Sequence, residues 1–143
     1  MITDAFLRVS TAQAVTTTAV STDKIDLSQA REIGEGADVY FVFTVGTAFS
    51  GGTNITFQVV TDDNASLSSP TVIAATAAIV TASLTAGAQF VVPVPPQIAS
   101  LGERYLGAQY TVSGTYSAGT VTADVVHNVQ DGKKYYPSGF TIQ

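Results

Sequence analysis

The stretch that decides the fold runs from Arg104 to Val126 and reads RYLGAQYTVSG (104–114), TYSAG (115–119) and TVTADVV (120–126). In the first part, Leu106, Tyr110 and other apolar residues at even positions alternate with small or polar residues, which is the period-two pattern of a half-buried β-strand. The last part is rich in Thr and Val, which favour strands. We therefore predict a hairpin-like pair of strands. Neither strand carries residues typical of a catalytic or metal-binding set.

Working outward, segments of strand character recur between turn signals that contain Gly, Asn, Asp or Pro. The expected strands are 14–20, 39–45, 55–60, 72–76, 78–83, 89–94, 105–113 and 120–127. About eight short strands with little helix predict an all-β fold, a jelly-roll-like sandwich of antiparallel strands. Helix is expected at most as one turn over Ser28–Ile33, where an irregular loop is the alternative. Residues 1–143 are expected to form a single domain.

The predicted core lies on two of these strands. Phe41 and Phe43 share a face in the segment 39–45, and Phe57 shares one with its branched neighbours in 55–60. We expect these three side chains to tolerate truncation least. Pro93, Pro95 and Pro96 place the end of the segment 89–94 at a sheet edge or in a loop. Open sheet edges are one route to assembly with a partner strand.

The composition argues against several functional classes. Charged residues make up only 12% of the sequence and the net charge is −5, so nucleic-acid binding is not expected. The basic pair Lys133-Lys134 is interpreted as an exposed turn. The chain has no cysteine, its first residues lack the pattern of a secretory signal, and its longest apolar stretch, 72–82, is too short to cross a membrane. We expect a soluble protein with no membrane partner.

A search for reactive groups predicts no catalytic residue, no cofactor and no metal ion. His127 is the only histidine. Asp124 lies three positions earlier on the same expected strand, so the two side chains should point to opposite faces. The segment Asp62-Asp63-Asn64 is interpreted as a loop tip rather than a calcium site, and Gly34-Glu35-Gly36 as a turn rather than a dinucleotide fingerprint.

Tyrosines are the best candidates for contacts with other proteins. Tyr110 lies on the apolar face of its strand and is expected in the core. Tyr105, Tyr135 and Tyr136 are candidate interface residues, with ordinary sheet packing as the alternative.

Several segments in order along the chain resemble the capsid cement, or decoration, proteins of tailed bacteriophages. They are Met1-Ile2-Thr3-Asp4-Ala5, Ile25-Asp26-Leu27, Arg31–Gly36, Arg104–Gly114, Ala118–Ala123 and Tyr136–Phe140. The resemblance spans almost the whole chain and is least distinct from Thr47 to Pro96. It implies a jelly-roll subunit made in the host cytoplasm that binds the outside of a shell of the major capsid protein. It also implies a homo-oligomer, with a dimer favoured and a trimer as the alternative, and no catalytic residues.

We therefore expect a structural virion protein on the outer capsid surface. The candidate polar and aromatic contacts are Asp4, Arg8, Arg31, Glu32, Glu35, Arg104, Tyr105, Tyr135 and Tyr136. One alternative function is a carbohydrate- or receptor-binding β-sandwich module of a phage tail or adhesin, although the chain lacks the Trp that sugar platforms often use. A small hydrolase using a serine and His127 is a second alternative.

Overall fold

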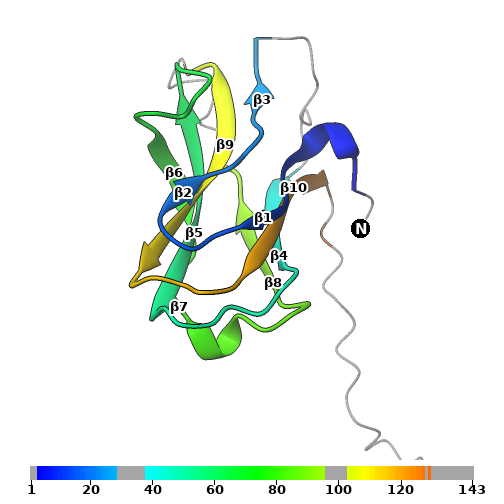
Figure 1. The fold of residues 1–143 in the computed structure, drawn as a ribbon. Helices are drawn as coiled ribbons and strands as arrows, with labels where there is room; N and C mark the ends of the chain where they lie inside the picture. The colour runs from blue at the N-terminus through cyan, green and yellow to red at the C-terminus, as the bar shows by residue number, and fades with distance from the viewer. Residues whose placement is uncertain (1–2, 29–37, 96–102, 128, 130–143) are drawn as a thin grey trace, which may run out of the picture.

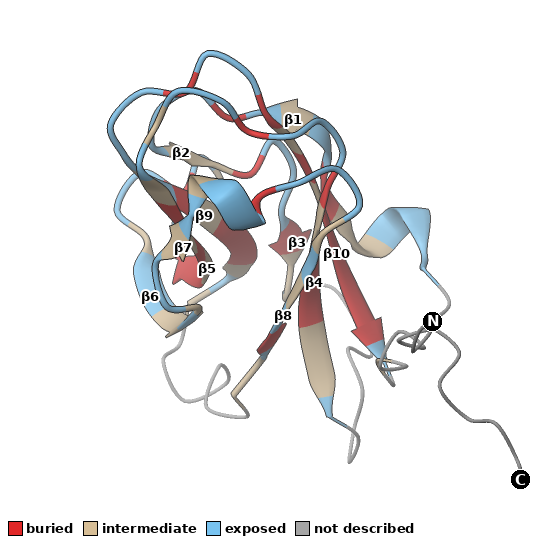
Figure 2. Ribbon diagram, turned by 90° about the horizontal axis from the view of Figure 1, so that it is seen from below, coloured by how far each residue is buried: buried red, intermediate tan, exposed pale blue. Residues whose placement is uncertain are grey.

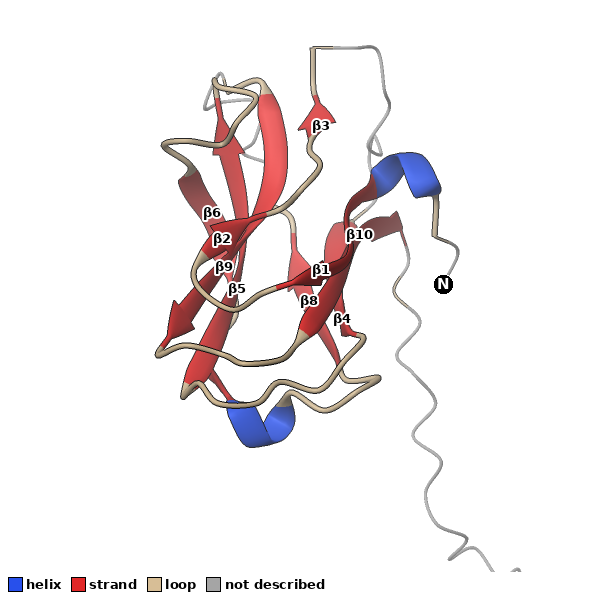
Figure 3. Cartoon of the chain, in the orientation of Figure 1, coloured by secondary structure: helices blue, strands red, loops and turns tan. Residues whose placement is uncertain are grey.

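A computed structural model describes residues 3–28, 38–95, 103–127 and 129 of the chain (Figure 1). These residues form strands joined by loops, with two short 3-10 turns, η1 (Ala5–Leu7) and η2 (Thr81–Ser83) (Figure 3). The strands are β1 (Arg8–Ala14), β2 (Ala19–Val20), β3 (Ile25–Asp26), β4 (Val39–Val45), β5 (Asn54–Asp62), β6 (Thr71–Ala75), β7 (Ile79–Val80), β8 (Gln89–Pro93), β9 (Tyr105–Ser113) and β10 (Thr120–His127).

The strands form two antiparallel sheets that face each other. One sheet has the order β1-β10-β4-β8 and the other β2-β9-β5-β6, with β3 also pairing with β9 and β7 with β5. If β2 and β3 are counted as one position, and β6 and β7 as another, the chain order is 1-8-3-6 in the first sheet and 2-7-4-5 in the second. This connectivity is that of a jelly roll, so the predicted fold is confirmed.

The core lies between the sheets, where the inward faces of both layers are buried (Figure 2). Phe41 and Phe43 of β4 and Phe57 of β5 are fully buried, as predicted. The ring centroids of Phe43 and Phe57 lie 4.9 Å apart and stack across the two sheets. Tyr110 of β9 meets Phe57 edge-on at 6.1 Å and donates a 2.6 Å hydrogen bond from its hydroxyl to Ser10 Oγ. The expectation that Tyr110 belongs to the core is therefore confirmed.

The predicted hairpin over 104–126 is wrong, although both of its strands exist with the expected bounds. β9 pairs with β5, β2 and β3, whereas β10 pairs with β1 and β4 in the other sheet. The link between them therefore crosses from one layer to the other. A period-two pattern fixes which face of a strand is buried, but it contains no information about the neighbouring strand.

Other boundaries also differ from the prediction. The segment 14–20 is mostly the connection between β1 and β2, and the strand that precedes it, Arg8–Ala14, was not predicted. Of the segment 78–83, only Ile79–Val80 is strand, because Thr81–Ser83 turns into η2. β3 was not predicted either. The helical turn predicted over Ser28–Ile33 lies, after Ser28, outside the described residues. β8 is an edge strand, as its prolines predicted.

Candidate interaction surfaces

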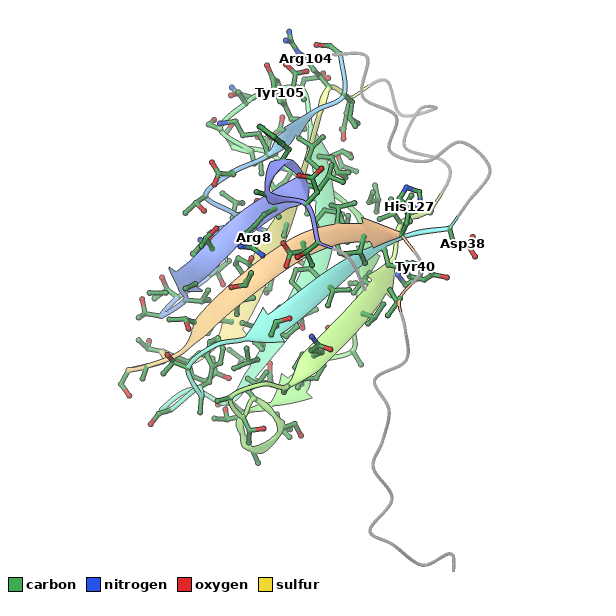
Figure 4. All side chains as sticks on the ribbon, turned by 90° about the vertical axis from the view of Figure 1, so that its right-hand side faces the viewer. Arg8, Asp38, Tyr40, Arg104, Tyr105 and His127 are labelled. Carbon is green, nitrogen blue, oxygen red and sulfur yellow. The ribbon has the colours of Figure 1, made fainter. Side chains whose placement is uncertain are left out.

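His127 and Asp124 lie on opposite faces of β10, as the sequence predicted. Asp124 is buried on the outer face of the four-stranded sheet, where its Oδ1 accepts a 2.7 Å hydrogen bond from Arg8 Nε of β1. His127 is exposed at the end of β10, beside Val39 of β4. In Figure 4 it lies near Asp38 and Tyr40, well away from Arg8. A dyad of these two residues is therefore not formed.

The proposed contact Arg8 is already engaged within its own chain. Its guanidinium joins β1 to β10 through Asp124, and its side chain is only 33% exposed. Asp4 has a local role too, because its Oδ1 accepts a 2.9 Å hydrogen bond from Phe6 N and caps η1. η1 in turn lies against β10. Both residues therefore organise the N-terminal segment on the outer face of this sheet.

Arg104 and Tyr105 lie together at one end of the sandwich (Figure 4). Arg104 donates two hydrogen bonds to the carboxylate of Asp26, of 2.9 Å from Nε and 2.7 Å from Nη2, and its guanidinium lies 5.1 Å from the Tyr105 ring centroid. The hydrogen bond from Arg104, followed by that from Ser28, holds the pKa of Asp26 far below its usual value. Half of the Arg104 side chain stays exposed, so it remains accessible to a partner.

The ion pair between Arg104 and Asp26 predicts a specific pH dependence of stability. A carboxyl whose pKa is lowered by folding stabilises the native state above its unfolded pKa of about 3.9, and the contribution is lost as the pH falls through the folded value. Below about pH 4 we therefore expect the melting temperature of the wild type to fall more steeply than that of Asp26→Asn. Thermal unfolding of both proteins, followed by circular dichroism across this pH range, measures the two slopes. Salt should reduce the difference, since the pair is exposed. Equal pH slopes in the two proteins would contradict the prediction.

A second pair, Asp38 and Tyr40, lies at the start of β4 beside His127 (Figure 4). The Tyr40 hydroxyl donates a 3.3 Å hydrogen bond to Asp38 Oδ2. The charge of Asp38 raises the pKa of Tyr40. The tyrosine is therefore neutral at physiological pH and presents a hydroxyl and a ring face at the end of the sheet.

Asp62 organises the loop between β5 and β6. It belongs to the acidic segment Asp62-Asp63-Asn64, whose sequence is compared above with that of a calcium site. Its carboxylate accepts hydrogen bonds from the backbone amides of Asn64 and Ser69, each 2.8 Å, and these lower the pKa of Asp62. The loop places Leu67 over Gly107 of β9, on the outer face of the sheet that contains β5 and β6, where Leu67 is buried. The described residues contain no group of three or more acidic or histidine side chains arranged to hold a metal ion.

The side of the sandwich formed by β6, β7 and β8 differs from the rest because the stretch of sequence that supplies these three strands is uncharged. From residue 39 to residue 102 the only charged residues are Asp62 and Asp63, and residues 64–102 contain neither charge nor histidine. Three edge positions expose large apolar side chains: Val72 on β6 is 44% exposed, Val80 on β7 is 57% and Val91 on β8 is 41%. Sequence reasoning noted the low overall charge but not this run, which is visible in the sequence.

The remaining predicted contacts, Arg31, Glu32, Glu35, Tyr135 and Tyr136, lie outside the described residues, as does the basic pair beside the last two. Asp26 was not predicted as a contact residue, although the segment Ile25-Asp26-Leu27 was noted for its resemblance. Within the part of the chain that is described, no helix is long and apolar enough to cross a bilayer.

Comparison of the sequence with known protein families gives a match. Residues 9–125 match the Bbp16 family, from β1 through almost all of β10. The chain therefore belongs to the Bbp16 family. No curated protein matches the sequence.

Proposed function

We propose that this protein is a non-enzymatic structural component of a tailed-phage virion, a cement or decoration subunit that binds the outside of the assembled major capsid protein shell. It is made in the cytoplasm of the host bacterium and acts on the shell as a homo-oligomer. The resemblance of the sequence to phage cement proteins, the jelly-roll fold that this resemblance implies and the match to the Bbp16 family support the proposal.

The observation that carries the proposal is the near absence of charge between residues 39 and 102. An ordinary soluble domain has about 25% charged residues, which keep its surface hydrated. Here the exposed positions of β6, β7 and β8 are Thr, Val, Ala, Gln and Pro instead. Such a surface is buried against a protein partner at low desolvation cost, because few charges lose their water.

Decoration stabilises a shell by mass action. A protein that binds only the assembled lattice lowers the free energy of that lattice, as any native-state ligand does, by about 2.7 kcal/mol per site when its free concentration is 100-fold above its Kd. Because a shell has many equivalent sites, a modest contact is multiplied over the particle. No bond-making step is required of the subunit.

Binding to purified shells tests the proposal. We expect the protein to bind undecorated, expanded shells saturably and to raise their melting temperature, measured by co-sedimentation and by calorimetry of the particles. Unexpanded shells of the same capsid protein serve as the control for lattice specificity. The absence of saturable binding at any salt concentration would count against the proposal, and a signal on a glycan array without shell binding would favour the carbohydrate-binding alternative.

A further inference from the structure

The free edges of the two sheets are not equivalent: among the described residues, β8 is the edge strand with a regular backbone whose outer side pairs with no other strand. At the opposite side, β1 has register shifts between Arg8 and Gln13, and its Val9 carbonyl accepts a 2.8 Å hydrogen bond from Asp23 N. β2, β3 and β7 are two residues long each. β6 has a register shift opposite Val59/Val60. Bulges and short lengths blunt an edge against pairing.

β8, by contrast, pairs with β4 in continuous register over all its five residues. Val94 N donates to Val39 O at 2.8 Å and Val45 N to Ala88 O at 2.9 Å, so the even-numbered residues of this strand direct their backbone groups toward β4. Since these directions alternate along a strand, Gln89, Val91 and Pro93 direct theirs outward. No described strand pairs with this outer side. It offers two N–H donors and three carbonyl acceptors, because Pro93 has no N–H.

We propose that the outer edge of β8 pairs with β8 of a second copy of this chain, antiparallel and about a two-fold axis at Val91. In this register Val91 of each copy exchanges two hydrogen bonds with Val91 of the other. Gln89 N–H of each copy donates to the Pro93 carbonyl of the other, which adds two more. The missing proline N–H leaves only the Gln89 carbonyls free for water, so Pro93 is compatible with this register.

Charge favours a second copy as the occupant. A protein with a net charge of −5 repels its own copies, but residues 64–95, which supply β6, β7 and β8, carry no charge to repel or to desolvate. The carboxylate of Glu103 lies at the end of β6, where it accepts a 2.8 Å hydrogen bond from Thr71 Oγ1 and not from a residue of β8. A two-fold contact brings the same neutral surface from both partners and closes on itself. The half-exposed Val91 side chains then lie opposite each other on the outer face, in line with Val42 of β4, and form an apolar cross-strand pair. The product is a continuous sheet across both subunits.

Cysteine cross-linking in this cysteine-free chain tests the contact directly. Directly opposed residues in a hydrogen-bonded antiparallel pair have Cα atoms roughly 5.5 Å apart, a separation that a disulfide spans. We expect Val91→Cys to form a disulfide-linked dimer rapidly and almost completely on mild oxidation. The control Val80→Cys on β7, which is more exposed than Val91 (57% against 41%), should remain largely uncross-linked.

A second variant measures affinity without a new bond. Val91→Pro removes an N–H that points away from β4, so the sandwich retains its internal pairing while two of the four hydrogen bonds between the copies are lost. We expect dimeric wild type in sedimentation equilibrium and a dissociation constant at least about tenfold higher for Val91→Pro. A monomeric wild type, or a dimer in which Val91→Cys cross-links no faster than the control, would overturn the inference. Both measurements use the free protein, so their outcome is separate from shell binding.

Discussion

Replacing Phe57 with alanine is expected to lower the free energy of unfolding by about 3–5 kcal/mol, a large part of the roughly 5–15 kcal/mol that stabilises a typical domain. Phe57 is fully buried on β5 at the centre of the sandwich. Its ring stacks on Phe43 of the opposite sheet at 4.9 Å and on Phe90 of β8 at 5.3 Å. Truncation leaves a cavity that contacts both sheets, and the surrounding strands cannot collapse into it without losing their register.

Chemical denaturation with urea measures this effect, and Phe57→Leu serves as the graded control. Leucine retains most of the buried volume, so its cost should be well below that of alanine. Thermal unfolding should show the same order, with the alanine variant melting on the order of 10–20 °C below the wild type. A loss of less than about 1 kcal/mol for Phe57→Ala would contradict the location of the core, because such a value is typical of surface positions.

The sequence predicted the strands whose alternation is uninterrupted. β4, β9 and β10 have the expected bounds, because each alternates core and outward residues throughout its length. β1 was missed because irregular register breaks its alternation: the neighbours Val9 and Ser10 are both buried, and Ala12 has a φ of 43°.

The contacts between distant residues could not be predicted, because they depend on strand order rather than on local pattern. Arg8 and Asp124 meet only because β1 and β10 are neighbours, and Arg104 meets Asp26 only because β3 pairs with β9. For the same reason the pair of strands at 104–126 resembled a hairpin, although the jelly roll separates them into two sheets. The uncharged segment 64–102 and the edge position of β8 could be recognised in the sequence, since both depend on composition and on proline.

The crossing between those two sheets depends on Gly119. Its φ is +143°, a conformation that side chains other than glycine rarely adopt, and a Cβ there would lie 2.3 Å from Cδ1 of Phe49. Phe49 is only 6% exposed, and its ring packs edge-on against Tyr116 with centroids 4.9 Å apart, so it has little room to move. Gly119 also accepts a 3.1 Å hydrogen bond from Val15 N, which ties the crossing to the segment after β1.

We therefore expect Gly119→Ala to lower the free energy of unfolding by about 2–4 kcal/mol, because overpacking adds to the cost of the backbone conformation. Gly87→Ala is the matched control: its φ is +83°, but a Cβ there would have no neighbour within 4 Å. It measures the cost of a side chain at positive φ without a new contact, roughly 1–2 kcal/mol. Urea denaturation of both variants gives the additional cost at Gly119, to which the Phe49 contact and the more restricted φ both contribute. If Gly119→Ala and Gly87→Ala lower the free energy of unfolding equally, Phe49 moves aside freely and the crossing is not packed as tightly as its geometry indicates.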